Sequence, residues 1–237
     1  MFALSPLFWH KVKPLPAILV LVAALTGCGR KEQPSTEPAN PQRPAVSESR
    51  PQDNRPVIVA FGDSLSEGHG LAPGQSYPDN LQRELDSGGY SYRVENAGVS
   101  GDTTSTGLTR LGEVIALHPE IVILELGAND GLRGIPIAAS TVNLEQMIIA
   151  LSQTGTRVVL AGMTLPPNYG PVYIKSFEKM YATLAAKYKL PLIPFLLEGV
   201  AGTDQFMQQD GLHPNAAGAK RVAATVMLTL APLLKRP

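Results

Sequence analysis

A serine stands at the end of an apolar run in the first third of the sequence. Residues 57–61 read VIVAF, and the tripeptide GDS that follows places Ser64 just past them. A serine hydroxyl is a poor nucleophile until a neighbouring base removes its proton. The position of Ser64 therefore raises the question of whether the chain also supplies a base.

The segment DGLHP near the C-terminus offers that base. Asp210 and His213 lie three residues apart in it. A turn with this spacing brings a carboxylate against the imidazole Nδ1, which fixes the tautomer and leaves Nε2 free to accept a proton. Taken alone, an Asp-x-x-His turn before a helix is also a common capping arrangement. Together with Ser64, it completes the set of groups that a Ser–His–Asp triad requires.

Acyl transfer also needs hydrogen-bond donors for the oxyanion that develops on the substrate. The segment NAGVSGDTTSTG contains Gly101, whose backbone N–H is not screened by a side chain, and ELGANDGLRG contains Asn129, whose amide can donate. Each residue also has a purely structural interpretation, because Gly101 can serve a tight turn and Asn129 can bond its own loop. Both residues remain candidates on this reasoning.

The elements that would position these residues alternate along the chain. Apolar runs, mostly β-branched as in strands covered on both faces, occupy residues 57–61, 92–95, 121–126, 157–162 and 192–195. One helix is expected behind Ser76 as its N-cap, with Tyr77, Leu81 and Leu85 on its buried face. Further helical patterns cover residues 103–117, 137–153, 173–188 and 214–234.

This alternation predicts an α/β fold built on a parallel sheet with right-handed crossovers. Such sheets place their sites at the carboxyl ends of the strands, and Ser64 and Asn129 directly follow the first and third predicted strands. The nucleophile elbow of α/β-hydrolases reads Gly-x-Ser-x-Gly. Here Ser66 replaces the second glycine, so this turn is not an elbow of that type.

Four short blocks, FGDSL, SGDT, GAND and DGLHP, resemble in order and position those of the GDSL or SGNH hydrolase family. The resemblance covers residues 57–237. The longer segments NAGVSGDTTSTGLTRL, ELGANDGLRG, LPPNYG and DGLHPN are most similar to a bacterial periplasmic branch of acyl-CoA thioesterases, lysophospholipases and arylesterases. The resemblance implies a three-layer αβα sandwich with a five-stranded, flavodoxin-like parallel sheet.

The resemblance also implies a role for each candidate residue. Ser64 would be the nucleophile, His213 the base and Asp210 the acid that orients it. The oxyanion donors would be the backbone N–H groups of Ser64 and Gly101 and the side chain of Asn129. Asp63 receives no catalytic role, and we expect it to brace the turn by bonding nearby amides.

Composition narrows the choice of partners and cofactors. Lys plus Arg and Asp plus Glu number 20 each, which leaves no basic excess for binding nucleic acid. The single cysteine excludes an internal disulfide and a Cys-rich zinc site. The four histidines are scattered with no closely spaced pair, so we expect neither a metal nor a cofactor.

The N-terminal segment has the features of a targeting signal. Basic residues precede an apolar stretch from Leu15 to Leu25, which is too short to span a bilayer. The ending Leu-Thr-Gly-Cys resembles a bacterial lipobox, which implies a signal peptide over residues 1–27 and lipidation of Cys28; an ordinary signal with a chance cysteine is the alternative. Residues 28–55, rich in Pro, Ser, Gln and charge, are expected to form a disordered tether, and residues 56–237 the catalytic domain.

These observations predict a monomeric, periplasm-facing serine esterase, anchored by the lipid on Cys28 in the bacterial cell envelope. The non-acidic Gly29 favours the outer membrane. Expected substrates are short or medium acyl esters, aryl esters, lysophospholipids and thioesters. The alternatives are an O-acetyl esterase of glycans or cell wall, and a non-catalytic lipoprotein that binds lipid or glycan.

Several further residues receive weaker assignments. His118 is expected to be structural, and His69 to lie near Ser64, where contact with substrate is a minor alternative. An acyl-chain cleft after the fourth strand is predicted, with ordinary packing as the alternative, for Met163, Leu165, Pro166, Pro167 and Tyr169.

Overall fold

The computed structural model describes residues 53–235. The proposed signal peptide, Cys28 and most of the proposed tether lie outside the described residues. At the start of the described part, the Arg55 guanidinium donates to the Asp53 carboxylate and to the carbonyl of Tyr92. No helix in the described part of the chain is both long and apolar enough to pass through a membrane.

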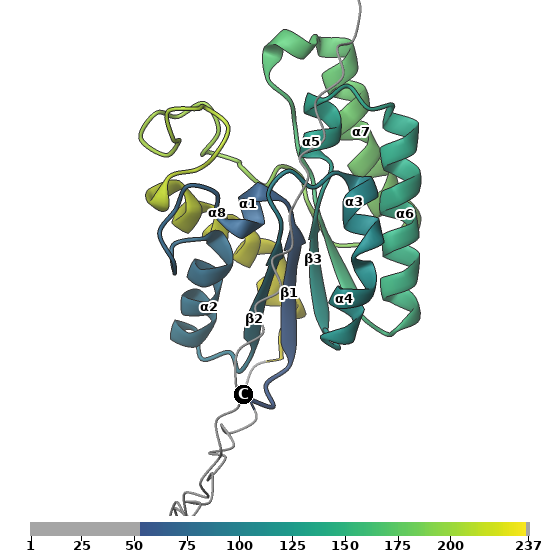
Figure 1. Ribbon diagram of the computed structural model, residues 1–237. Coiled ribbons are helices and arrows are strands. Elements are labelled where there is room, and N and C mark those ends of the chain that lie inside the picture. The colour runs from purple at the N-terminus through teal and green to yellow at the C-terminus, as the bar shows by residue number, and fades with distance from the viewer. Residues whose placement is uncertain (1–52, 236–237) are drawn as a thin grey trace, which may run out of the picture. The chain divides into compact units, whose positions relative to one another are not determined.

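A five-stranded sheet forms the centre of the molecule (Figure 1). Its order is β2-β1-β3-β4-β5, and every neighbouring pair is parallel. The strands are β1 (Val57–Gly62), β2 (Arg93–Gly98), β3 (Ile121–Glu125), β4 (Arg157–Ala161) and β5 (Leu192–Ile193). This order confirms the predicted flavodoxin-like α/β fold.

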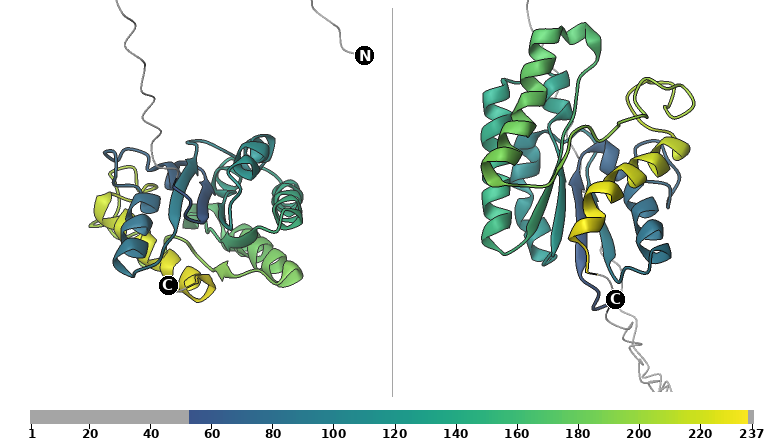
Figure 2. Two further views of the ribbon diagram at one scale, coloured as in Figure 1. Left: turned by 90° about the horizontal axis from the view of Figure 1, so that it is seen from below. Right: turned by 180° about the vertical axis from the view of Figure 1, so that it is seen from behind.

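Helices cover both faces of the sheet (Figures 1 and 2). One face carries α2 (Tyr77–Ser87) and α8 (Ala216–Leu230), which pack against each other; the other carries α3 (Thr104–Thr109), α4 (Leu111–Ala116), α6 (Ile137–Gln153) and α7 (Pro171–Tyr188). The short helices α1 (Ser64–Glu67) and α5 (Ala128–Leu132) follow β1 and β3 directly. The three-layer αβα arrangement therefore matches the prediction.

The burial pattern explains why these segments form these elements. Every residue of β1 and β3 is buried, as expected of central parallel strands. Ser76 caps α2 in a capping box with Asp79, and the face that carries Leu81 and Leu85 is buried. Asn215 caps α8 by accepting from the N–H groups of two following residues.

The bounds of two predicted strands differ from the structure by more than one residue. β2 extends to Gly98 although its last residues are polar or small, because Asn96–Gly98 pair with the end of β1. β5 ends at Ile193 rather than at residue 195, since Pro194 has no N–H with which to continue the ladder.

Three helix predictions also need correction. The helix expected over residues 103–117 is broken at Arg110, whose φ is −102° and whose side chain turns inward to the carbonyls of Gly62 and Ala97. The last helix begins at Ala216, after its Asn215 cap, and gives way to a 3₁₀ turn at Ala231–Leu233. The helix expected from residue 173 begins at Pro171, where a proline is favoured in the first turn.

Candidate active site

Ser64 is the first residue of α1, immediately beyond the carboxyl end of β1. The Asp63 side chain caps this helix by accepting a hydrogen bond from the N–H of Leu65 at 3.0 Å. Gly62, at the end of β1, lies beside Gly98 of β2 and Glu125 of β3 in the sheet register. The turn that carries Ser64 therefore lies where three strands end together, as predicted for a site in a parallel sheet.

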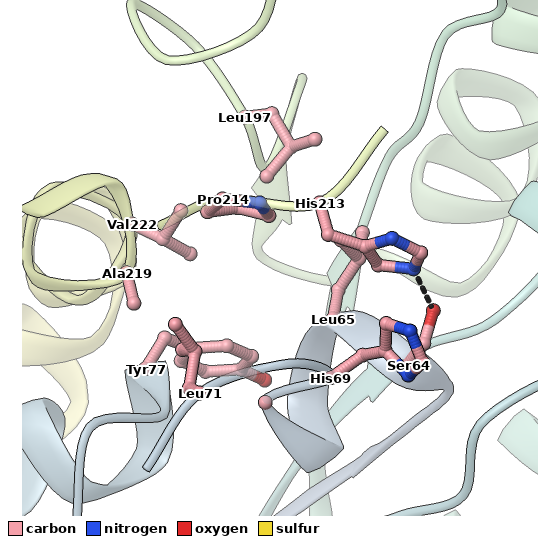
Figure 3. Close-up of a pocket in the computed structure, with 11 residues that line it drawn as sticks. Ser64, Leu65, His69, Leu71, Tyr77, Leu197, His213, Pro214, Ala219 and Val222 are labelled. Atoms are coloured by element: carbon pink, nitrogen blue, oxygen red, sulfur yellow. Dashed lines mark hydrogen bonds between the residues drawn. The ribbon is translucent and has the colours of Figure 1, made fainter. Parts of the chain in front are cut away.

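The structure brings Ser64, His213 and Asp210 into one hydrogen-bonded line. Ser64 Oγ is 2.9 Å from His213 Nε2, and His213 Nδ1 is 2.6 Å from Asp210 Oδ2. The dashed line in Figure 3 marks the first of these hydrogen bonds. Because a carboxylate only accepts, Nδ1 carries the proton and Nε2 is left to accept from the serine hydroxyl. This is the arrangement in which an imidazole removes a proton from serine.

A tight turn holds the Asp210 carboxylate against the ring. Its Oδ1 accepts from the backbone N–H groups of Leu212 and His213 at 2.9 and 3.0 Å, and Gly211 takes a left-handed φ of 67°. Partial burial opposes ionisation, but the hydrogen bonds from the His213 ring and from the two N–H groups lower the pKa of Asp210 to about 2. The carboxylate is therefore charged wherever a neutral imidazole is needed as base.

Asn129 lies in the first turn of α5, where β3 ends. Its Nδ2 donates to Asp63 Oδ2 at 3.1 Å and to the carbonyl of Asp102 at 2.9 Å. Both amide hydrogens are therefore engaged, and an oxyanion would have to share or replace one of these bonds. This engagement could not be read from the sequence.

Two backbone N–H groups remain available near the same edge. Within residues 53–235, neither Ser64 nor Gly101 donates its backbone N–H to a protein acceptor. Gly101 takes a left-handed φ of 83°, and Arg133 Nη2 donates to its carbonyl at 3.0 Å. The glycine is thus needed for its conformation, and its loop is held by Arg133, the residue that follows α5.

Asp63 braces the turn, as the sequence predicted. It is 1% exposed and accepts from Leu65 and Asn129. Burial raises the pKa of Asp63 to about 6, against the hydrogen bonds from these two groups.

Sequence reasoning missed Glu125, whose side chain lies fully buried under this turn. Its Oε2 accepts from the backbone N–H of Asp63 at 3.2 Å. The available signal was an acidic residue at the end of the otherwise apolar strand IVILE.

An apolar cleft of about 500 Å³ opens beside Ser64 and His213. Met163, Leu165, Pro166 and Pro167 line it, as predicted, but Tyr169 does not, and its hydroxyl instead donates to the carbonyl of Leu132 at 2.8 Å. The other apolar lining residues are Leu65, Ala128, Leu132, Phe195, Leu197, Ala201, Met207 and Leu212. The cleft thus adjoins the hydroxyl that would attack a carbonyl carbon.

The two remaining histidines of the described chain occupy different positions. The His69 ring lies 4.5 Å from the His213 ring, centroid to centroid, and is labelled beside Ser64 in Figure 3. His118 is exposed in the turn between α4 and β3, with a left-handed φ of 49°. Among residues 53–235, no group of three or more His, Cys, Asp and Glu side chains is placed to hold a metal ion.

The sequence is similar to a known protein family and to several individual proteins. A model described as the GDSL-like Lipase/Acylhydrolase family matches residues 60–221. Esterase TesA of Pseudomonas aeruginosa is 46% identical over 179 residues, which cover 75% of this chain and 89% of that protein. Arylesterase of Vibrio mimicus is 40% identical over 170 residues, or 71% of this chain and 85% of that protein.

A more distant relative and a solved structure agree with these matches. Thioesterase 1/protease 1/lysophospholipase L1 of Escherichia coli (strain K12) is 35% identical over 179 residues, covering 75% of this chain and 85% of that protein. A crystal structure of TesA superimposes with a TM-score of 0.73 and 45% identity, covering 75% of this chain and 99% of that one.

Proposed function

The chain belongs to the GDSL-like lipase/acylhydrolase family and is an esterase, and we propose that the Ser64 hydroxyl is its nucleophile. The continuous line from Ser64 Oγ through His213 to Asp210, with 2.9 and 2.6 Å between the paired atoms, carries this proposal. A base in hydrogen-bond contact with the hydroxyl, itself oriented by a charged acid, is what activates a serine.

The first half of the reaction forms an acyl-enzyme. Ser64 Oγ attacks the carbonyl carbon of the ester while its proton moves to His213 Nε2, and Asp210 stabilises the imidazolium that results. The tetrahedral intermediate collapses by breaking the bond to the alcohol oxygen, which takes the proton from Nε2. The alcohol leaves, and the acyl group remains on Ser64.

Water completes the cycle. His213 Nε2 removes a proton from a water molecule, whose oxygen attacks the acyl carbon. The second intermediate breaks its bond to Ser64 Oγ, which recovers the proton from the imidazolium. The carboxylic acid is released and the hydroxyl is restored.

The oxyanion of each intermediate is proposed to accept from three donors. The backbone N–H groups of Ser64 and Gly101 have no protein acceptor in the described structure, and the Asn129 amide lies between Asp63 and the Asp102 carbonyl. One of the Asn129 hydrogens is expected to turn toward the oxyanion as negative charge develops there.

The cleft supports an ester with an apolar acyl chain. Its lining is mostly Leu, Met, Pro and Phe, so longer acyl groups would gain binding as they displace water from it. We expect kcat/KM for p-nitrophenyl esters to rise from acetate to medium chain lengths. Activity confined to acetyl esters would instead favour the O-acetyl esterase alternative, and a preference for butyryl-CoA would identify a thioesterase.

The serine assignment has a direct test. Ser64→Ala is expected to lower hydrolysis of p-nitrophenyl butyrate by at least about 10⁴-fold and to abolish labelling by a fluorophosphonate probe. The matched control is Ser152→Ala, because Ser152 is exposed at the end of α6. Equal rates for Ser64→Ala and the unmodified protein would overturn the proposal. An unmodified protein that neither hydrolyses the ester nor reacts with the probe would support the non-catalytic binding lipoprotein instead.

We propose in addition that Cys28 carries a lipid that anchors the esterase in the bacterial envelope, facing the periplasm. The support is the order Leu-Thr-Gly-Cys after a short apolar stretch, together with the gain in membrane affinity from more than one acyl chain. Wild type is expected in the outer-membrane fraction with an acylated N-terminal peptide by mass spectrometry. Cys28→Ser should lose both, and an unmodified Cys28 in wild type would rule out the anchor.

A further inference from the structure

A fully buried carboxyl group lies under the turn that carries Ser64. Glu125, the last residue of β3, is 0% exposed. Its Oε2 accepts from the backbone N–H of Asp63 at 3.2 Å and from the hydroxyl of Ser66 at 2.8 Å. One carboxyl oxygen therefore bonds the residue before Ser64 and the residue two positions after it.

These bonds are part of a longer chain of contacts across the core. The Ser66 hydroxyl is also within 3.1 Å of the Tyr77 hydroxyl on α2, while the Asp63 carboxylate accepts from Asn129 on α5. Glu125 thus links a helix on one face of the sheet, the serine turn and the amide proposed for the oxyanion. A displacement of its carboxyl group would reach both catalytic elements.

Close packing fixes the carboxyl group as firmly as its hydrogen bonds. A Cβ atom added to Gly62 would lie 2.2 Å from Glu125 Oε2 and 2.2 Å from Ser66 Oγ. The φ of Gly62 is not left-handed, so this glycine is required for space rather than for conformation. The carboxyl group therefore packs directly on the backbone of β1 at Gly62, two residues before Ser64.

The hydrogen bonds that Glu125 accepts favour a negative charge on it, but they do not offset its burial. Within residues 53–235, Oε1 has no hydrogen-bond partner and no cation forms an ion pair with this side chain. The titratable groups that face it are Asp63 from the serine turn, Tyr77 from α2 and Tyr181 from α7. Burial, and then the charge on Asp63, raise the pKa of Glu125 well above its ordinary value.

An ionised Glu125 would also oppose the reaction, because an anion under Ser64 repels the oxyanion that forms above it. A protonated carboxyl keeps an acceptor for the Asp63 N–H and bonds to Ser66 without adding charge. When the surroundings shift the pKa values of two acids in one site apart, the two acids can serve different roles, one charged and one neutral.

We propose that Glu125 is a positioning residue of this esterase: as a neutral carboxylic acid it holds the turn that presents the Ser64 hydroxyl to His213 and, through Asp63, holds the Asn129 amide. This inference rests on the proposed role of Ser64 as nucleophile. It assigns Glu125 no contact with substrate.

The test compares Glu125→Gln with Glu125→Leu in hydrolysis of p-nitrophenyl butyrate. Gln keeps a neutral acceptor for Asp63 and Ser66, so we expect kcat within about threefold of wild type and an unchanged midpoint of the acid limb of the pH profile. Leu removes both bonds, and we expect kcat to fall about 10- to 100-fold at similar KM, because small misplacements of a nucleophile are costly. Glu113→Gln, at an exposed position of α4, is the control.

Two results would overturn the proposal. A Glu125→Leu enzyme within about threefold of wild type would show that the turn does not depend on this side chain. A Glu125→Gln enzyme whose acid limb moves by about half a pH unit or more would show that Glu125 carries a charge.

A second variant covers the case in which Glu125→Leu does not fold. Ser66→Ala removes one of the two bonds and is expected to lower kcat about three- to tenfold at unchanged KM, since one hydrogen bond is lost. An unchanged kcat would count against the proposal. The result for Ser64→Ala separates the two hypotheses: an active Ser64→Ala enzyme defeats the proposed nucleophile, whereas an inactive one beside a fully active Glu125→Leu enzyme defeats only the positioning role.

Discussion

Two carboxyl side chains near Ser64 have pKa values that are shifted in opposite directions. Asp210 lies in an exposed loop, where donors from the His213 ring and the backbone lower its pKa to about 2. Glu125 lies in the core under the turn, where burial and the neighbouring charge on Asp63 raise its pKa. The pKa of the same chemical group is therefore lowered in one region and raised in the other.

The difference shows how environment assigns a role to an acid. A charged carboxylate beside an imidazole stabilises the imidazolium that forms when the serine loses its proton. A charged carboxylate under the serine would instead repel the oxyanion, so the position there suits a neutral acid. Asp63, with its pKa raised to about 6 by burial, lies between these extremes and bonds to the candidate oxyanion amide.

The largest effect on activity is expected from a change at Asp210, the exposed member of the pair. Asp210→Asn keeps the shape of the loop but removes the charge that fixes the imidazole tautomer, and we expect kcat for p-nitrophenyl butyrate to fall about 10⁴-fold. Asp204→Asn, at an exposed position of the same loop, is the matched control. A loss of less than about tenfold would show that Asp210 does not act through His213.

The second-largest effect on activity is expected from a change at Asn129, whose amide donates to the buried Asp63 and is proposed to donate to the oxyanion. Asn129→Ala removes one of three proposed donors and is expected to lower kcat about 10²- to 10³-fold with little change in KM. Asn54→Ala, at an exposed position near the start of the described residues, serves as control. If KM alone rises, Asn129 binds substrate uniformly rather than stabilising the transition state.

A smaller effect is expected when a side chain is added at Gly62, because it would crowd the buried Glu125 and lower the stability of the protein. Gly62→Ala places a methyl group 2.2 Å from Glu125 Oε2, and we expect the free energy of unfolding to fall by about 2–4 kcal/mol. Gly112→Ala is the control, because a Cβ there meets nothing within 4 Å and α4 should gain about 0.5–1 kcal/mol. Urea unfolding measures both, and equal stabilities would show that the space around Glu125 is not restricted.

The smallest expected effect is a gradual change in the free energy of unfolding with pH. Because the folded-state pKa of Glu125 is raised, the native protein holds a proton that the unfolded chain releases above about pH 4.5, so native stability falls as pH rises. Glu125→Gln removes this term, and its stability relative to wild type should grow by up to about 1.4 kcal/mol per pH unit above that value.

Asp210 should show the opposite sign in the same unfolding series. Its folded-state pKa is lowered, so its contribution is present above its ordinary value of 3.8 and is lost as pH falls toward 2. The contribution is small because the side chain is partly exposed. A constant difference between Glu125→Gln and wild type from pH 4 to 8 would contradict the neutral assignment of Glu125.

Much of the candidate site could be predicted because its residues lie in short segments at the ends of elements. The apolar runs determine where the strands form, and parallel strands bring their carboxyl ends to one edge of the sheet. Ser64 and Asn129 follow two such strands, so their proximity followed from the order of elements. The Asp210–His213 contact followed from their spacing in a turn.

Other features were decided by contacts between distant segments. Arg110 interrupts a helical pattern because its side chain reaches the carbonyls of Gly62 and Ala97. The polar end of β2 is a strand because β1 supplies its partner. Periodicity within one segment does not contain either fact.

The sequence by itself determined the alternation of strands and longer helices and the family blocks, and it located the serine, histidine and aspartate that are proposed to act. Each of these depends on neighbouring residues or on a short spacing. Only the tertiary structure decided the burial of Glu125, which raises its pKa, and the engagement of the Asn129 amide. The physical reason is that burial and hydrogen-bond partners come from residues far apart in the chain, and these set the pKa of an acid and the availability of a donor.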